Sequence, residues 1–173
     1  MSNLRKLTIE DAKEFFDCAW DENVHRYMPG YYCDSLERAR EVISNLLSDR
    51  DTKAYVIKSL THSFIGVIVA VKKGKRDGRK EVEISYFINE KYRHKGYATA
   101  AVEQILRKYK KYRVYFDIDS TNSKSLALAK KFNVQKGEGE MYFFENIWRK
   151  WTNVHFLFIY LYYFTNKLTK YPT

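Results

Sequence analysis

The sequence contains few of the residues that cross-link a chain or interrupt its regular elements. Its 173 residues include two cysteines, two prolines and seven glycines. Two cysteines, Cys18 and Cys33, are too few for a framework of disulfides or a four-ligand metal site, so we expect two small buried thiols and no bound metal. The scarcity of glycine and proline favours regular helices and strands with short loops between them.

Long apolar runs are also scarce. A nearly apolar run covers residues 154–164, whereas a membrane-spanning helix needs about 20 residues. We interpret this run as a covered strand, either in the core or at an interface, so the protein is expected to be a monomer or a homodimer. Residues 1–6 lack the apolar core of a secretory signal peptide. A cytoplasmic protein without a membrane partner is therefore expected.

Acidic residues are outnumbered by basic ones. The chain has 31 lysines and arginines against 21 aspartates and glutamates, which gives a net charge of +10. Between residues 91 and 113 the only acidic residue is Glu103. This charge implies an anionic partner, which could be nucleic acid, a polyanionic cofactor or an acidic surface. No known nucleic-acid motif accompanies the basic stretch, so nucleic acid is not the expected partner.

The length and the order of the expected elements indicate one mixed α/β domain over residues 1–173. A chain of this size can bury a core without a disulfide or a metal. Apolar runs predict strands at residues 4–7, 54–60, 64–71, 81–88 and 112–118, and two more between residues 140 and 164. Helical spacing predicts helices that begin near residues 8, 34, 96 and 122. Residues 21–30 are interpreted as a break and a connector, and residues 72–80 as a solvated basic turn.

The stretch from residue 83 to residue 122 contains the clearest candidate site. A strand at residues 84–88 is followed by a turn, a basic loop and a helix that opens at Gly96 or Tyr97. The first amides of a helix have no partners within the helix, and the helix dipole adds partial positive charge there. Gly96 lets the backbone approach a ligand closely or adopt a positive φ. The loop at residues 93–98 is therefore predicted to bind an anion.

The loop sequence, Arg-His-Lys-Gly-Tyr-Ala at residues 93–98, resembles the Q/R-x-x-G-x-G/A acetyl-CoA motif of the GNAT acetyltransferases. Residues 4–11 and 24–28 resemble the RimJ/RimL-like branch of that family. Residues 83–86 match its E-I-G-Y strand, with Ser85 in place of glycine. Asn122, Ser125 and Lys131 fit its N-x-x-S…K pattern, whereas Asn133 and the valine after it replace the usual G-F. The resemblance extends over residues 4–134.

This resemblance implies a fold and a place for the cofactor. The fold would be a GNAT-type mixed, largely antiparallel sheet with a central V-shaped splay and helices on both faces. The strand at residues 83–88 would carry a bulge and diverge from the strand at 112–118. Pantetheine would lie in that gap, within a cofactor-binding core at residues 81–134. The residues implied to bind acetyl-CoA are Phe87, Ile88, Arg93, His94, Lys95, Gly96, Tyr97, Ala98, Thr99, Asn122 and Ser125.

The implied reaction is the attack of a neutral primary amine on the thioester of acetyl-CoA. Glu83 is our candidate for the base, acting through a water molecule, and an amide near Ile88 would stabilise the oxyanion. Many relatives place a tyrosine acid in the last helix, but that position is Ala129 here, so the role is vacant or filled from elsewhere. Because a thiol pKa is near roughly 8.5, a strong acid is optional. Alternation puts Tyr86 on the face opposite Glu83 unless a bulge intervenes.

The acceptor amine stays open on the sequence alone. The RimJ/RimL-like features suggest a protein N-terminal amine, of the ribosomal-protein type. A small amine such as a polyamine or an aminoglycoside is an alternative. Two further alternatives are a GNAT domain that binds acetyl-CoA without catalysis and a basic nucleic-acid-binding domain.

Overall fold

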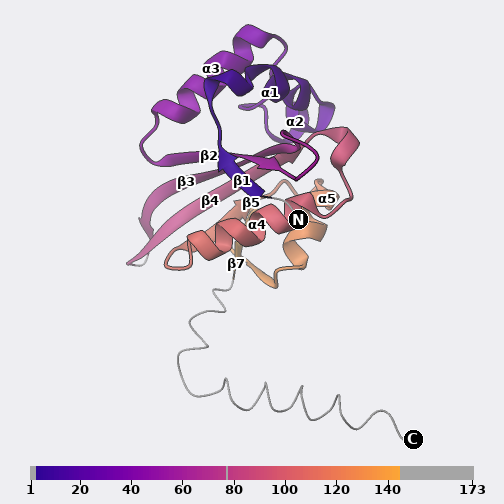
Figure 1. Ribbon diagram of the computed structural model, residues 1–173. Helices are drawn as coiled ribbons and strands as arrows, with labels where there is room; N and C mark the ends of the chain where they lie inside the picture. The colour runs from indigo at the N-terminus through magenta and orange to yellow at the C-terminus, as the bar shows by residue number, and fades with distance from the viewer. Residues whose placement is uncertain (1–2, 77, 145–173) are drawn as a thin grey trace, which may run out of the picture.

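The computed structural model describes residues 3–76 and 78–144. Their strands form one seven-stranded sheet in the order β1-β2-β3-β4-β5-β7-β6 (Figure 1). Every neighbouring pair in the described sheet is antiparallel except β4 and β5. The predicted mixed, largely antiparallel sheet is thus confirmed. The strands are β1 (Asn3–Lys6), β2 (Thr52–Lys58), β3 (Gly66–Arg76), β4 (Arg79–Ile88), β5 (Arg113–Asp117), β6 (Val134–Lys136) and β7 (Met141–Phe144).

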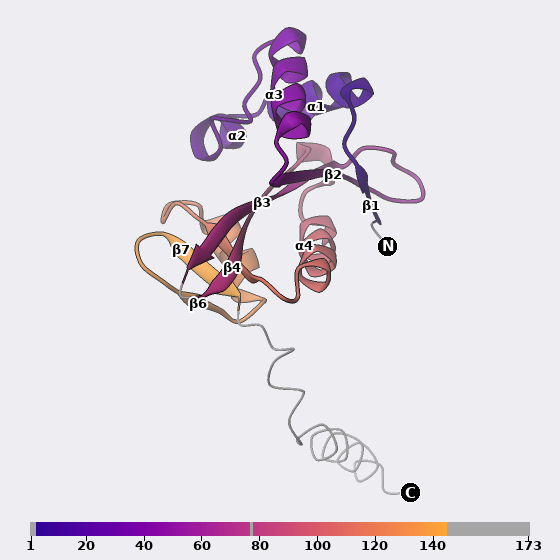
Figure 2. The same cartoon turned by 90° about the vertical axis from the view of Figure 1, so that its left-hand side faces the viewer.

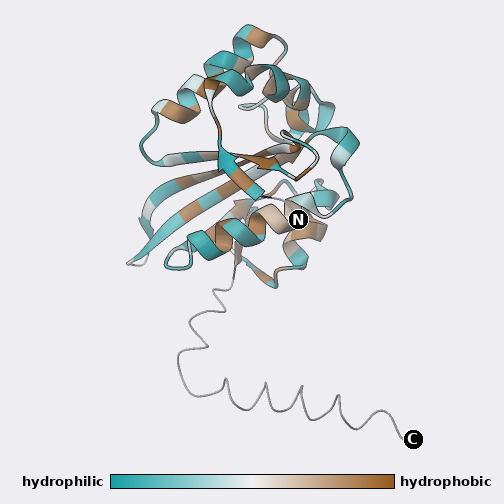
Figure 3. Ribbon diagram, viewed as in Figure 1, coloured by the Kyte–Doolittle hydropathy of each residue, from teal (hydrophilic) through white to brown (hydrophobic). Residues whose placement is uncertain are grey.

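Helices cover both faces of the sheet, as predicted (Figures 1 and 2). On one face lie η1 (Ile9–Asp11), α1 (Ala12–Ala19), α2 (Glu22–Tyr27) and α3 (Leu36–Ser48). The other face is covered by α4 (Tyr97–Lys108) and α5 (Ser123–Lys130), and η2 (Glu90–Tyr92) precedes α4. Each layer buries its own cluster of apolar side chains against the strands. In Figure 3 the hydrophobic colour concentrates in the strands, while the helices alternate between hydrophobic and hydrophilic positions.

Alternation along β4 decides which layer each side chain joins. Phe87 belongs to the cluster beneath α1 and α3, and Ile84 and Ile88 belong to the cluster beneath α4 and α5. Tyr86 packs against that second cluster. Because successive strand residues point to opposite faces, Glu83 shares the face of Phe87. Tyr86 therefore lies on the face opposite Glu83, as the alternation predicted.

The pairing of β4 with β5 is short. It joins Glu81 to Arg113 and ends where Glu83 pairs with Tyr115. From there β4 continues to Ile88 beside β3, while β5 pairs with β7. The two strands therefore diverge, and within the described residues the last part of β4 lacks a strand partner on its β5 side. This is the V-shaped splay that the resemblance implied.

The bulge expected at residues 83–88 is not there. The register between β3 and β4 runs without a break from Ile88 opposite Gly66 to Val82 opposite Lys72. The irregularity lies instead in β3, between Lys72 and Lys75, where Gly74 has a φ of 83°. A glycine at positive φ is the usual residue of such a bulge, because it has no Cβ to clash. The expectation was therefore wrong about which strand is irregular.

Other differences from the sequence prediction concern residues thought to be loops. Residues 22–27 form helix α2, and most of residues 72–80 belongs to a long hairpin of β3 and β4 rather than to a turn. Lysine and arginine side chains on an exposed ribbon are solvated whether the backbone is paired or not, so their composition hid the strands. Strand β6 was also not expected. The predicted strand at residues 154–164 lies outside the described residues.

Local contacts fix where the helices begin and end. Thr8 and Asp11 form a capping box, Ser35 caps α3, and Asn133 adopts a positive φ of 50° after α5. Cys18 and Cys33 are free and buried, and burial raises the pKa of both thiols. Across the described part of the chain, no helix combines the length and apolar character that a membrane span requires.

Candidate active site

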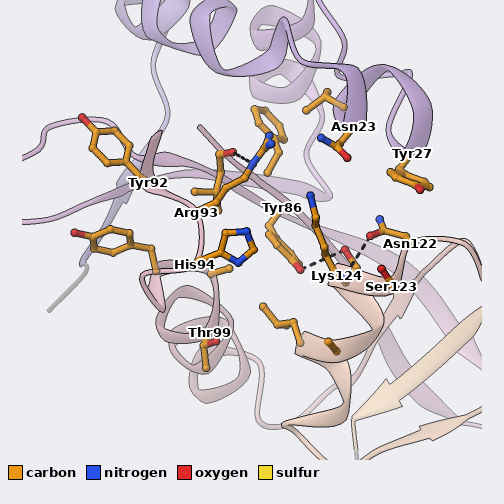
Figure 4. Close-up of a pocket in the computed structure, with 18 of the residues that line it drawn as sticks. Asn23, Tyr27, Tyr86, Tyr92, Arg93, His94, Thr99, Asn122, Ser123 and Lys124 are labelled. Atoms are coloured by element: carbon orange, nitrogen blue, oxygen red, sulfur yellow. Dashed lines mark hydrogen bonds between the residues drawn. The ribbon is translucent and has the colours of Figure 1, made fainter. Parts of the chain in front are cut away.

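A cavity of about 570 Å³ lies where α2, the end of β4, the loop before α4 and the start of α5 meet (Figure 4). It adjoins the last part of β4, which lies beyond the pairing with β5. Most of the residues implied to bind acetyl-CoA line it, although they come from three separate parts of the chain. These lining residues are Phe87, Ile88, Arg93, His94, Gly96, Tyr97, Ala98, Thr99, Asn122 and Ser125.

Two of the predicted site residues do not line the cavity. The Lys95 amine donates to the carbonyl of Lys91 at 3.0 Å. The Glu83 carboxylate lies 3.0 Å from the amine of Lys73 and accepts a 3.3 Å hydrogen bond from the Tyr115 hydroxyl. Glu83 is thus at the closed end of the splay, on the face of α1 and α3. Any action of Glu83 on a substrate in the cavity would need a bridging water.

The backbone of β4 presents Ile88, rather than Phe87, to the gap. The amide of Asn89 donates to Ile65, and the carbonyl of Phe87 approaches Gly66 so closely that an added Cβ would lie 2.3 Å away. Successive residues of a strand direct their amide and carbonyl groups to opposite sides. Ile88 therefore directs its backbone groups away from β3, and its carbonyl accepts from the Arg93 side chain at 3.0 Å.

The loop before α4 has the backbone of an anion site. His94 and Gly96 have φ values of 61° and 79°, and Gly96 is the N-cap of α4. In the described structure no side chain caps α4, and its first turn contains no acidic residue. The amides of Tyr97, Ala98 and Thr99 therefore have no partner within the helix, and the helix dipole makes this end positive.

The Arg93 side chain links this loop to α2. Its guanidinium lies 2.8 Å from the carboxylate of Asp21, and both side chains are mostly buried. Asp21 also accepts hydrogen bonds from the amides of Asn23 and Val24, which makes it the N-cap of α2. Burial raises the pKa of Asp21, but the hydrogen bond and charge of Arg93, with the two α2 contacts, more than offset this, so the pKa is lowered.

The start of α5 forms the opposite wall. Asn122 caps α5 by accepting from the amide of Ser125 at 3.1 Å. The hydroxyl of Tyr86 donates to the hydroxyl of Ser125 at 3.4 Å. Lys124 extends from the same turn into the cavity (Figure 4). Across the cavity, the Tyr27 hydroxyl donates to the carbonyl of Thr121 at 3.4 Å, which joins α2 to the loop before α5.

Sequence reasoning missed the wall that α2 provides. Asn23, Val24, Tyr27 and Met28 line the cavity, but residues 21–30 were interpreted as a break and a connector. Asp21 was the available signal, because aspartate is a preferred N-cap residue. The other lining residues that were not predicted to bind acetyl-CoA are Tyr86, Tyr92, Ser123, Lys124, Ala127, Leu128 and Lys131.

An open helix N-terminus beside an unpaired strand edge is the arrangement implied by the resemblance. The sequence matches the family described as acetyltransferase (GNAT) domain over residues 3–135. The chain belongs to the GNAT acetyltransferase family. This membership confirms the predicted enzyme class, an acetyl-CoA-dependent N-acetyltransferase. The match does not distinguish branches of the family, so the RimJ/RimL-like assignment stays a prediction.

Solved structures show the same fold. This GNAT chain is similar to a Vibrio cholerae spermidine N-acetyltransferase in complex with CoA and spermine, with a TM-score of 0.67 and 15% identity over 82% of this chain and 91% of that one. It is also similar to a GNAT-family acetyltransferase from Bacillus anthracis, with a TM-score of 0.63 and 22% identity over 80% of this chain and 81% of that one. No curated protein sequence matches.

Proposed function

We propose that this GNAT acetyltransferase transfers the acetyl group of acetyl-CoA to a primary amine of a small polycation, of the polyamine kind. The observation that supports the cofactor most directly is one cavity that contains both the open N-terminus of α4 and the gap-facing edge of β4. The amides of Tyr97, Ala98 and Thr99 suit a pyrophosphate. The Ile88 amide, next to the splay, suits pantetheine or the thioester oxygen.

The side chains around the cavity fit the rest of the cofactor. Arg93 is engaged with Asp21 and with the Ile88 carbonyl, so it supports the loop and leaves anion binding to the amides. Lys124 extends into the cavity and can neutralise a phosphate. Acetyl-CoA supplies an activated acyl group, and the CoA thiolate is an adequate leaving group near neutral pH. No part of this chemistry calls for a metal, and the expectation that none is bound stays a prediction.

For the proton on the amine, Glu83 remains our candidate base. It lies at the vertex of the splay, on the face opposite α4 and α5. A carboxylate there can accept a proton from an incoming amine through one water molecule. Its ion pair with Lys73 and its hydrogen bond from Tyr115 hold the carboxylate in place.

Carboxylates beside the splay favour a cationic acceptor. Burial, followed by the nearby charges of Glu83 and Glu140, raises the pKa of Asp117 at the end of β5. Asp117 and Glu83 come from the two strands that diverge, so an acceptor approaching the gap on this face meets negative charge within a protein of net charge +10. A spermidine N-acetyltransferase is among the proteins of the same fold. Together these points favour a polyamine over a protein N-terminus.

An acceptor screen with acetyl-CoA tests this proposal. Thiol release would be measured with spermidine, with peptides bearing free N-termini and with aminoglycosides. We expect spermidine to give the highest kcat/KM. Asp117→Asn should lower kcat/KM for spermidine by about tenfold, since one close charge pair is worth about 1 kcal/mol or more. Glu103→Gln removes the same charge from an exposed site on α4, 3.9 Å from Arg107, and serves as the matched control.

The screen separates the alternatives. If a peptide N-terminus is acetylated faster than spermidine, the acceptor is a protein N-terminus rather than a polyamine. If Asp117→Asn and Glu103→Gln reduce thiol release equally, then net charge attracts the amine, rather than the carboxylates at the splay.

A further inference from the structure

The position on α5 that carries the general acid in many relatives offers no proton here. By the resemblance, the position of the acid is Ala129, whose side chain is buried with 1% of its surface exposed. A methyl group cannot donate a proton. The thiolate must therefore leave without help or take its proton from another residue. The inference that follows rests on the proposed function.

Tyr86, on strand β4, places a hydroxyl group near this part of α5. It lines the cavity, and its ring extends from β4 toward α5, where its hydroxyl meets Ser125 at 3.4 Å (Figure 4). Ser125 precedes Ala129 by four residues, so the two occupy the same side of α5 one turn apart. Ala129 belongs to the apolar cluster against which Tyr86 packs. The phenol thus occupies the region that a tyrosine on α5 would reach.

The position of Tyr86 relative to Glu83 suits the reaction. Because β4 has no bulge in this stretch, the two side chains lie on opposite faces of the sheet, three residues apart beside the gap. Attack on a thioester needs a proton removed from the amine nitrogen and a proton given to the sulfur. Nitrogen and sulfur are different substituents of the tetrahedral carbon, so a base on one face and an acid on the other can serve both.

We propose that Tyr86 is the general acid of the acetyl transfer and that Ser125 positions it. The amine loses one proton to the base and forms the C–N bond. When the C–S bond breaks, its electron pair goes to sulfur, and the O–H proton of Tyr86 passes to that sulfur to give the CoA thiol. The phenolate then takes a proton from water, and the hydroxide that is left is neutralised by the proton that the base received from the amine. The net products are the acetamide and the CoA thiol.

The surroundings of Tyr86 fit this role. Burial raises the pKa of Tyr86, while the hydrogen bond to Ser125 lowers it in part. The phenol therefore keeps its proton at neutral pH. The Ser125 hydroxyl accepts from Tyr86 in this structure, and by rotating it can donate to the phenolate instead. Ser125 is itself fixed, because its amide donates to the side chain of Asn122 at 3.1 Å.

Tyr86→Phe removes the hydroxyl and keeps the ring. We expect kcat to fall by about 100-fold, the lower end of what a positioned acid contributes, with little change in acetyl-CoA affinity. Tyr142→Phe is the matched control, since Tyr142 packs against the same cluster but does not line the cavity, and it should keep the wild-type kcat. Ser125→Ala should lower kcat less than Tyr86→Phe, and Ser125→Thr should restore it.

A binding measurement tests the placement without turnover. Calorimetry would compare CoA with desulfo-CoA at pH 9.5, where most of the thiol is ionised. A phenol next to the sulfur strengthens thiolate binding, so Tyr86→Phe should weaken CoA by about tenfold and leave desulfo-CoA unchanged. An equal effect on both ligands, or none on CoA, would show that the hydroxyl is not at the sulfur and would overturn the inference.

The outcomes also separate this inference from the proposed function. If wild-type protein acetylates an amine and Tyr86→Phe retains a kcat within twofold of Tyr142→Phe, Tyr86 is not the acid although the function stands. If the wild-type protein binds neither CoA nor desulfo-CoA, the proposed function fails and the role of Tyr86 fails with it.

Discussion

The contact between Asp21 and Arg93 should stabilise both the fold and the cavity. Asp21 performs two tasks, since it caps α2 and pairs with Arg93 at 2.8 Å. Asp21→Ala removes both, whereas Asp21→Asn keeps a good N-cap and removes only the charge. The two variants therefore divide the contribution of Asp21 into a capping part and an ionic part.

The structure sets the expected size of each part. Loss of an N-cap costs about 1 kcal/mol. The side chains of Asp21 and Arg93 are 14% and 18% exposed, so their pair lies between an exposed pair, worth about 0–1 kcal/mol, and a buried one, whose disruption costs about 3–5 kcal/mol. We expect Asp21→Asn to lower the free energy of unfolding by about 1.5 kcal/mol and Asp21→Ala by about 2.5 kcal/mol. At about 2–4 °C per kcal/mol, Tm should fall by about 3–6 °C and 5–10 °C.

Urea unfolding at several pH values measures these differences. The pKa of Asp21 is lowered in the folded state, so its ionic contribution is present above the unfolded pKa of about 4 and is lost as pH falls through the lower folded value. The difference between wild type and Asp21→Asn should therefore be constant from about pH 5 to 8 and shrink as pH falls below the unfolded pKa of about 4. Because α2 lines the cavity, both variants should also weaken acetyl-CoA binding.

Three results would refute this reasoning. Equal stability of wild type and Asp21→Asn at pH 7 would mean that the ion pair contributes nothing. Equal stability of Asp21→Asn and Asp21→Ala would mean that capping of α2 by this side chain contributes nothing to stability. Unchanged acetyl-CoA affinity in a destabilised Asp21→Ala would show that Arg93 does not couple α2 to the binding loop.

Further predictions concern two glycines and the candidate base. Gly96→Ala should cost about 1–2 kcal/mol, because Gly96 has a φ of 79°, and Gly96→Trp should in addition abolish acetyl-CoA binding measured by calorimetry. Gly66→Ala should lower Tm more than Gly96→Ala, because its Cβ would lie 2.3 Å from the Phe87 carbonyl; equal shifts would contradict the close approach of β3 to β4. Glu83→Gln should lower turnover while acetyl-CoA affinity stays near that of wild type, and an unchanged pH–rate profile would remove Glu83 from the role of base.

Local signals in the sequence predicted the binding loop well. Gly96 and the basic residues around it indicated an anion site at a helix N-terminus, and the structure shows a positive φ and an uncapped first turn there. Asn122 and Ser125 were predicted from a short motif, and both line the same cavity. These features depend on a few residues that are adjacent in the chain, which is why the sequence reveals them.

Features that depend on pairing between distant residues were harder to predict. The irregularity of β3 near Gly74 and the partners of Glu83 are set by how β3, β4 and β5 align, which no local pattern encodes. Helix α2 is only six residues long, so it carries little periodic signal. The contact of Tyr86 with Ser125 joins residues 39 positions apart, and only the folded chain shows that this phenol of β4 contacts α5 one turn before Ala129.

The central claim is that the cavity between the edge of β4 and the start of α4 binds acetyl-CoA. Calorimetry of the wild-type protein with acetyl-CoA, repeated with Gly96→Trp, tests it most directly. We predict one bound acetyl-CoA per wild-type chain and no measurable binding to a Gly96→Trp protein whose unfolding transition remains cooperative. Absence of binding to the wild type, or equal binding to a folded Gly96→Trp, would contradict the assignment of this cavity.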